Sequence, residues 1–256
     1  MEINQAFAIL SNASDSHVAR IIIEKFGHMS RFAVWRVARQ LRRGVPVAKI
    51  IHEKWFYGIP FYTNQHTLDP RPDTETLVES VLRDWQTTNG VRILDLGTGT
   101  GCVMISVAWG IPSLSGIGVD ISRSALRVAL KNIKKMGLCE RLDLVRGTFQ
   151  DAHINGEQFD IIVSNPPYIA RGDKRVNTGA QFDPEIALYA DNNGLLAYEQ
   201  IAKNARAWIK RSGRLYVEIG AGMSRAVRSV FSSFGWKFVR ADKDLGGKIR
   251  VLVFSM

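Results

Sequence analysis

The residues with the clearest chemical meaning form a short segment directly after an apolar run. The run covers residues 159–164, and the segment consists of Asn165, Pro166, Pro167 and Tyr168. An apolar run that ends at prolines predicts a buried strand that stops abruptly, and ligands of open α/β sheets bind where such strands end. An asparagine oxygen and proline carbonyls can accept hydrogen bonds from a flat NH2 group, while an aromatic ring covers its face. The segment therefore predicts a site for an amino nitrogen, although a proline turn with a packed tyrosine explains the same residues.

A glycine-rich loop lies upstream, again after a short apolar run. It reads Asp95-Leu96-Gly97-Thr98-Gly99-Thr100-Gly101. Glycine permits a sharp turn and a close approach to a ligand, and the helix that follows offers unpaired N–H groups. The third glycine comes one residue too early for a dinucleotide-binding fingerprint. Because Asp95 can bind an ammonium group, the loop favours S-adenosylmethionine (AdoMet) instead.

A further carboxylate, Asp120, ends the next apolar run at residues 116–120. An acid about 20 residues past such glycines is placed to bind ribose hydroxyls. Asp120 could also cap a helix that begins near Ser122, and the two roles are compatible.

These three segments together resemble class I AdoMet-dependent methyltransferases that act on amino nitrogens. A narrower resemblance comes from Asp69-Pro70-Arg71-Pro72-Asp73-Thr74-Glu75, which is similar to a segment of the HemK/PrmC family, the release factor glutamine methyltransferases. Segments at 42–50, 55–58, 182–188 and 244–250 are also similar to that family, so the resemblance extends from about Leu41 to the end of the chain. Asp183 stands where the family usually has glutamate, and Thr148 replaces a usual acid.

The resemblance implies a role for each matching residue. The cofactor-binding residues would be Gly97, Thr98, Gly99, Thr100 and Gly101 around the methionine part of AdoMet, Asp120 at the ribose, Phe149 beside the adenine, and Asn165. The catalytic residues would be Asn165, Pro166 and Tyr168. The acceptor would contact these three together with Pro167 and Arg71, although a buried ion pair explains Arg71 equally well. No metal site and no general base are expected, and His153 fits a surface loop.

The elements that position these segments follow from hydrophobic patterns. Residues 1–52 have helical patterns, residues 55–63 alternate as in a β-hairpin, and a helix begins near Thr74. Strands are predicted near 92–96, 116–120, 142–146, 160–164, 213–219, 238–240 and 249–254, with an insertion at 169–192 and a helix near 194–211. The resemblance implies an α/β fold, with a Rossmann-like seven-stranded methyltransferase sheet, a small helical N-terminal domain and a linking β-hairpin. The expected boundaries are 1–52 for substrate recognition, 53–72 for the hairpin linker and 73–256 for the AdoMet-dependent methyltransferase domain.

Composition limits the partners. The formal net charge is +10, from 34 Lys and Arg against 24 Asp and Glu. This excess favours acidic or nucleic-acid-associated partners, but solvated basic faces explain it equally well. Cys102 and Cys139 give no framework of bridges, and no apolar run is long enough to span a bilayer. We expect a cytoplasmic monomer with no metal and no membrane contact.

Three functions differ in how well they account for these residues. The favoured one is methyl transfer from AdoMet to the side-chain amide nitrogen of the glutamine in the Gly-Gly-Gln motif of peptide chain release factors. The positive charge is also compatible with an enzyme that acts in proximity to the ribosome. The alternative is methylation of the exocyclic amine of adenine in DNA or RNA, which uses the same acceptor geometry but normally needs a separate recognition region. A non-catalytic AdoMet-binding scaffold would need neither an acceptor segment nor a complete glycine loop.

Overall fold

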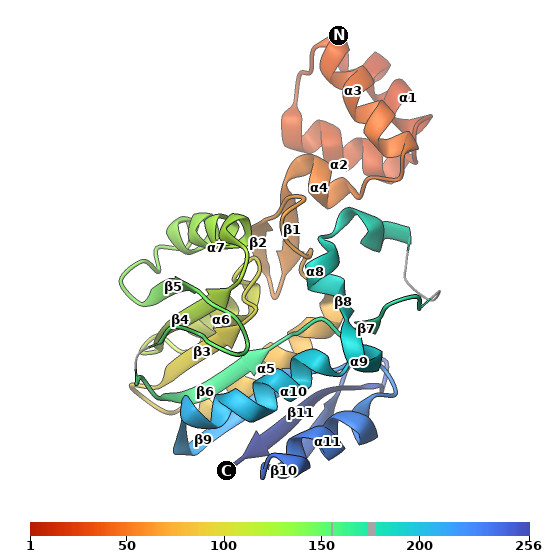
Figure 1. Cartoon of the computed structure of the whole chain (residues 1–256). Coiled ribbons are helices and arrows are strands. Elements are labelled where there is room, and N and C mark those ends of the chain that lie inside the picture. Colours follow the sequence, from red (N-terminus) through yellow and green to blue (C-terminus); the bar gives the residue numbers. More distant parts are fainter. Residues whose placement is uncertain (155, 174–177) are drawn as a thin grey trace.

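The computed structural model describes residues 1–154, 156–173 and 178–256 of the chain. A small group of helices at the N-terminus is joined by a hairpin to a larger α/β part (Figure 1). The helices are α1 (Ile3–Ser11), α2 (Ser16–Phe26), α3 (Arg31–Arg42) and α4 (Val47–Ile51), and the hairpin strands are β1 (Glu53–Phe56) and β2 (Ile59–Tyr62). Leu10, Ile22 and Val34 are fully buried where the first three helices meet. This small core orders the segment before the hairpin.

The larger part is built on a seven-stranded sheet with the order β10-β11-β9-β6-β3-β4-β5. Its strands are β3 (Arg92–Leu96), β4 (Ser115–Asp120), β5 (Leu142–Arg146), β6 (Phe159–Ser164), β9 (Ile209–Glu218), β10 (Lys237–Lys243) and β11 (Ile249–Ser255). The five neighbouring strands β9, β6, β3, β4 and β5 pair in parallel, whereas β11 pairs antiparallel with both β9 and β10. The seven-stranded α/β sheet confirms the predicted fold class.

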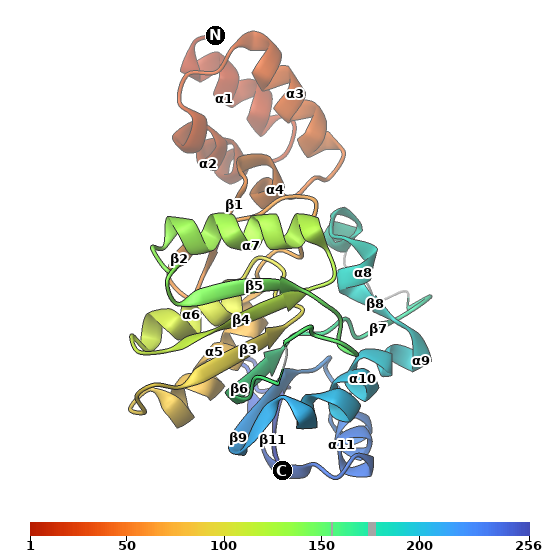
Figure 2. The ribbon, with the colours of Figure 1, turned by 60° about the vertical axis from the view of Figure 1, so that its left-hand side comes forward.

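Helices cover both faces of this sheet (Figures 1 and 2). On one face lie α5 (Pro72–Trp85), α6 (Cys102–Gly110) and α7 (Arg123–Lys135), and on the other lie α10 (Leu196–Asn204) and α11 (Ser224–Ser233). Successive residues of a strand point to opposite faces, so Ile93 packs in the first core and Leu94 in the second. Burial on both faces explains why the central strands read as continuous apolar runs.

The strand order reverses between β3 and β6. The chain proceeds outward from β3 to β4 and β5, then returns to place β6 on the other side of β3. Leu96 at the end of β3 pairs with Ser164 at the end of β6. The glycine loop and Asn165 therefore start side by side at a topological switch point, where open α/β sheets bind their ligands.

One predicted boundary was wrong. The helix expected near 194–211 ends at Asn204, a short η2 helix (Ala205–Ala207) follows, and β9 begins at Ile209 rather than near Gly213. Residue Ile209 pairs with Phe159, whose N–H donates to the Trp208 carbonyl at 2.8 Å. Pairing with β6 therefore extends the strand backwards into residues with helical patterns.

The insertion before α10 contains several short elements. These are β7 (Ile169–Ala170), η1 (Thr178–Phe182), α8 (Glu185–Leu188), β8 (Tyr189–Ala190) and α9 (Asp191–Gly194). Strands β7 and β8 pair with each other in parallel, away from the main sheet. They support α8, which lies beside the carboxyl ends of the central strands (Figure 1).

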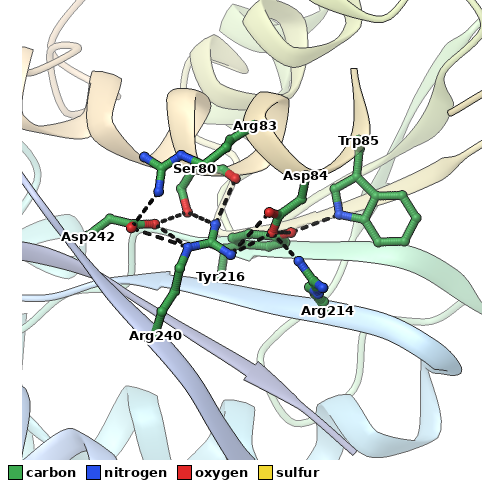
Figure 3. Close-up of polar contacts among 8 residues, drawn as sticks. All are labelled: Ser80, Arg83, Asp84, Trp85, Arg214, Tyr216, Arg240 and Asp242. Atoms are coloured by element: carbon green, nitrogen blue, oxygen red, sulfur yellow. Dashed lines mark hydrogen bonds and ion pairs between the residues drawn. The ribbon is translucent and has the colours of Figure 1, made fainter. Parts of the chain in front are cut away.

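A charged network attaches helix α5 to β9 and β10 (Figure 3). The Arg240 guanidinium lies 2.9 Å from Asp84 Oδ2 and 3.0 Å from Asp242 Oδ2, and the Tyr216 hydroxyl donates to Asp84 Oδ2 at 2.6 Å. Burial opposes ionisation of Asp84, but hydrogen bonds from Tyr216, Arg214 and Arg240 lower its pKa below the ordinary value. The network thereby fixes the helix whose first turn reaches the carboxyl ends of the strands.

Candidate active site

A cavity of about 400 Å³ opens at the carboxyl ends of β3, β4 and β6. This volume is within the range of pockets that hold small molecules. Its wall includes Asp95 and residues 97–100 of the glycine loop, together with Asp120, Phe149, Asn165, Pro167 and the segments 66–71, 147–150 and 186–187. Residues from at least six separate parts of the chain thus form one site.

The glycine loop is held open by its backbone. Gly97 has a φ of +77°, and a Cβ atom on it would lie 3.3 Å from the Phe149 ring. The N–H groups of Gly97 and Thr98 donate to the Val119 carbonyl at 2.8 and 2.9 Å. These bonds tie the loop to the end of β4 and leave room above it for a ligand beside Phe149.

Two acids line this cavity, the buried Asp95 and the partly buried Asp120. Asp95 is 2% exposed and accepts a hydrogen bond from Thr98 Oγ1 at 2.7 Å. Burial raises the pKa of Asp95 to about 7, because the ionised form has lost its hydration. A cationic ligand beside Asp95 would stabilise the ionised form, which is the chemistry expected for the ammonium of AdoMet.

Asp120 organises the loop and the start of α7. Its Oδ2 accepts from the Gly99 N–H and its Oδ1 from the Ser122 N–H, both at 2.9 Å. The N-cap of α7 is Ser122, whose Oγ accepts from the Ala125 N–H at 3.2 Å. Asp120 therefore does not cap the helix directly, and each of its oxygens retains a lone pair that can accept from a hydroxyl.

The acceptor segment is only partly on the cavity wall. Asn165 and Pro167 line it, whereas Pro166 and Tyr168 are not among the described residues that do. The Tyr168 ring instead lies over Gly220, where an added Cβ would meet it at 3.0 Å. Burial raises the pKa of Tyr168 to about 12, so the phenol stays protonated at neutral pH. The roles of Pro166 and Tyr168 stay predictions.

The side chain of Asn165 is oriented by its neighbours. Its Nδ2 donates to Thr74 Oγ1 at 3.1 Å, and no described residue donates to its Oδ1. Thr74 lies in the first turn of α5 and is 2% exposed. The free oxygen of Asn165 fits an acceptor that brings N–H groups.

Arg71 both lines the cavity and forms an ion pair, so the two interpretations of this residue are compatible. Its Nη2 lies 2.6 Å from Asp183 Oδ2, and its side chain is 41% exposed. Lys49, which is almost fully buried, lies 2.9 Å from Asp183 and 2.8 Å from Asp69. This cluster joins α4 to the segment before α5 and to the residues before α8. The sequence contains one indication of this cluster: Lys49 is a single charged residue in the otherwise apolar stretch 47–51.

Phe149 and Thr148 lie beside the expected adenine position, and Thr148 is the residue that stands in place of the expected acid. Phe149 lines the cavity next to Gly97. Thr148 Oγ1 accepts from the N–H groups of Gln150 and Asp151 at 3.2 and 3.0 Å, which closes a local turn. His153 is exposed and pairs with Asp151 at 3.0 Å, as expected for a surface loop.

Sequence analysis missed Glu218 in this region. It ends β9 as Asp120 ends β4, so the same reasoning could have identified it. Within the described ranges, no helix is both long and apolar enough to cross a membrane, and no group of three or more His, Cys, Asp or Glu could hold a metal ion.

Known proteins resemble this chain in sequence and in fold. The family model of the methyltransferase small domain matches residues 71–198. A release factor glutamine methyltransferase of Agrobacterium fabrum is 39% identical, over 86% of this chain and 78% of that protein. The hMettl16 catalytic domain has the same fold, with a TM-score of 0.62, 16% identity and coverage of 78% of this chain and 76% of that chain.

A bifunctional methyltransferase of Rickettsia typhi is 32% identical over 98% of this chain but only 53% of that protein. The chain thus spans about half the length of the bifunctional relatives that it matches. Its match to the shorter relative covers most of both chains. This chain therefore belongs to the release factor glutamine methyltransferase family.

Proposed function

We propose that this chain transfers a methyl group from AdoMet to the side-chain amide nitrogen of the glutamine in the Gly-Gly-Gln motif of peptide chain release factors. One observation carries the proposal: the glycine loop and Asn165 line one cavity at adjacent strand ends. The relatives named for this activity, among them the protein of Agrobacterium fabrum, support the choice of acceptor.

The residues of the cavity fit AdoMet. The loop at Gly97–Gly101 would surround the methionine part, and Asp95 would face its ammonium. Asp120 would accept from the ribose hydroxyls, and Phe149 would lie beside the adenine. When bound, AdoMet supplies an electrophilic methyl group on a sulfonium, so the protein needs no strong acid to activate the leaving group.

The chain's own task is to orient the acceptor. An amide nitrogen delocalises its lone pair into the carbonyl and is a poor nucleophile. Hydrogen bonds from its NH2 group to Asn165 Oδ1 and to the Pro166 carbonyl would fix its direction and stabilise positive charge as it develops. We assign Tyr168 to covering the amide plane and Arg71 to the entrance. Orientation of two bound reactants can contribute roughly 7 to 11 kcal/mol, which makes positioning the main catalytic effect here.

The N-terminal helices have a surface suited to docking the protein substrate. On α3, Phe32 is 78% exposed and Trp35 is 47% exposed, and no acidic residue lies between Glu24 and Glu53. The same helix exposes Arg36 and Arg39. We propose that this aromatic and basic face contacts a negatively charged surface of the release factor, and that proximity to the ribosome adds to this attraction.

The test is methyl transfer from labelled AdoMet to a recombinant release factor. Its Gly-Gly-Gln→Gly-Gly-Ala variant and adenine-containing DNA and RNA serve as parallel acceptors. Label on the unaltered factor alone supports the proposal, and label on nucleic acid would replace it with adenine methylation. We expect a monomer that acts in the cytoplasm, which gel filtration and cell fractionation can check.

A further inference from the structure

Glu218 is a buried acid beside the acceptor residue. Strands β6 and β9 pair in parallel with Ser164 opposite Val217, so the next residues, Asn165 and Glu218, leave the sheet as neighbours. Glu218 is also paired with Val251 of β11, and it is 2% exposed. It therefore lies almost fully buried at the carboxyl end of β9, between β6 and β11.

The contacts of this carboxylate are few. Hydrogen bonds from the side chains of Thr74 and Asn165 favour its ionised form. Its Oε2 has no hydrogen-bond partner in the described part of the chain. The nearby Arg250 guanidinium is shared with Asp244 at 2.8 Å and Asp73 at 2.6 Å. A buried, incompletely paired carboxylate is costly for a fold, and stability gives no reason for one here.

The chemistry of Asn165 supplies a reason. A carboxamide can rotate to exchange its oxygen and its NH2 group, which have nearly the same size. An ionised carboxylate only accepts hydrogen bonds, so beside Asn165 it favours the rotamer that presents the NH2 group. The oxygen then points away from Glu218, and it is the atom left without a donor.

We propose that Glu218 is a positioning residue, which acts with Thr74 to hold the NH2 group of Asn165 and so directs the Asn165 oxygen at the methyl acceptor. The inference rests on the proposed function, because it gives Asn165 Oδ1 the task of accepting from the substrate amide.

The inference carries a pH dependence. Burial raises the pKa of Glu218 to about 7. Protonated Glu218 can donate as well as accept, so the constraint on Asn165 is lost in acid, and kcat should rise with pH through this value. The charged and titratable groups that influence Glu218 are Arg250 from β11 and Asp73 from α5, and those that it influences are Tyr168, Tyr198 and Cys102.

Among these neighbours, the two tyrosines and the cysteine do not titrate near neutrality. Burial raises the pKa of both Tyr168 and Cys102 to about 12 and that of Tyr198 well above its ordinary value. Asp95, whose pKa is also about 7, faces the cofactor instead. At saturating AdoMet the titration of Asp95 does not affect the pH dependence of kcat, because a bound cation keeps Asp95 ionised.

The experiment compares the wild-type chain with Glu218→Gln and Glu218→Asp, and with Glu140→Gln as an exposed control. Glutamine keeps the size of Glu218 but can donate, so we expect kcat to fall roughly 10- to 100-fold. The dissociation constant for AdoMet and the thermal midpoint should stay near those of the control, and the acid limb of the pH profile should disappear. Aspartate remains an acceptor only and should restore that limb.

A second readout does not depend on activity. The side-chain NH2 signals of Asn165 in a ¹⁵N NMR spectrum should shift with a midpoint near the Glu218 pKa in the wild-type chain and stay constant in Glu218→Gln. Unchanged kcat in Glu218→Gln, or an amide signal that titrates in both chains, would overturn the positioning role. Absence of label on the release factor with the wild-type chain would contradict the proposed function instead, and the NMR comparison would still decide this inference.

Discussion

Replacement of Asn165 by alanine is the sharpest test of the acceptor site. The substitution removes Oδ1, the free acceptor on the cavity wall, and also the NH2 group that donates to Thr74 at 3.1 Å. Removal of one preorganised hydrogen bond to a charge that develops in the transition state costs about 2.7–4 kcal/mol, or roughly 10²- to 10³-fold in rate. We expect kcat for the release factor to fall by this factor.

Affinity for AdoMet should change little in the same variant. The glycine loop is fixed by hydrogen bonds to the Val119 carbonyl and the Asp120 carboxylate, and none of these involves Asn165. The dissociation constant measured by isothermal titration calorimetry should therefore stay within about 3-fold of the wild-type value, which corresponds to less than 1 kcal/mol.

The matched control is Asn204→Ala. Asn204 is also half-buried and donates one side-chain hydrogen bond, to the Gln200 carbonyl at 2.7 Å, but it lies at the end of α10 away from the cavity. Its kcat should match the wild-type value. If Asn165→Ala retains kcat within about 5-fold, or loses AdoMet affinity to the same extent as kcat, the division between cofactor loop and acceptor residue is wrong.

Three further predictions concern the ion-pair cluster around Lys49, the glycine loop and the charged network of Figure 3. Lys49→Met leaves the buried Asp69 without a cation, whereas Asp183 keeps its pair with Arg71. The free energy of unfolding in urea should fall by about 3–5 kcal/mol. Lys25→Met breaks an exposed pair and should cost at most about 1 kcal/mol; equal losses would refute the assigned burial. Gly97→Ala places a methyl group 3.3 Å from Phe149 at a positive φ, so AdoMet affinity should fall at least about 10-fold, and an unaltered titration would contradict the tight fit. The pKa of Asp84 in the folded state is lowered from 3.8. The ionised side chain should therefore stabilise the fold fully above pH 3.8, and this stabilisation should be lost as the pH falls through the lower, folded-state pKa. Urea titrations at different pH values should show that this part of the acid dependence is absent in Asp84→Asn.

The apolar runs determined most of the fold by themselves. A strand buried on both faces must be apolar throughout, and residues 159–164 and 92–96 show this pattern without reference to anything distant. The glycine loop and the proline segment were equally local, because a turn at the end of a strand depends on the φ values that its own residues can adopt. These features predicted a ligand site at the strand ends and the resemblance to the family from the sequence alone.

Local patterns could not assign the start of β9. Residues 209–211 were predicted to continue the helix, but β6 offers hydrogen-bonding groups along its edge, and pairing with it places them in a strand. The position of Tyr168 was also undecided, since the chain after the prolines could direct its ring into the cavity or toward Gly220.

The neighbours of Asn165 were decided by the tertiary structure alone. Thr74 lies 91 residues away in sequence, and the docking of α5 on the sheet, through its apolar face and the Arg240–Asp84 pair, brings it to the end of β6. Glu218 becomes adjacent because β9 pairs with β6 in a particular register. A sequence specifies which residues can carry out the chemistry, but the direction in which an amide points depends on partners that long-range packing supplies.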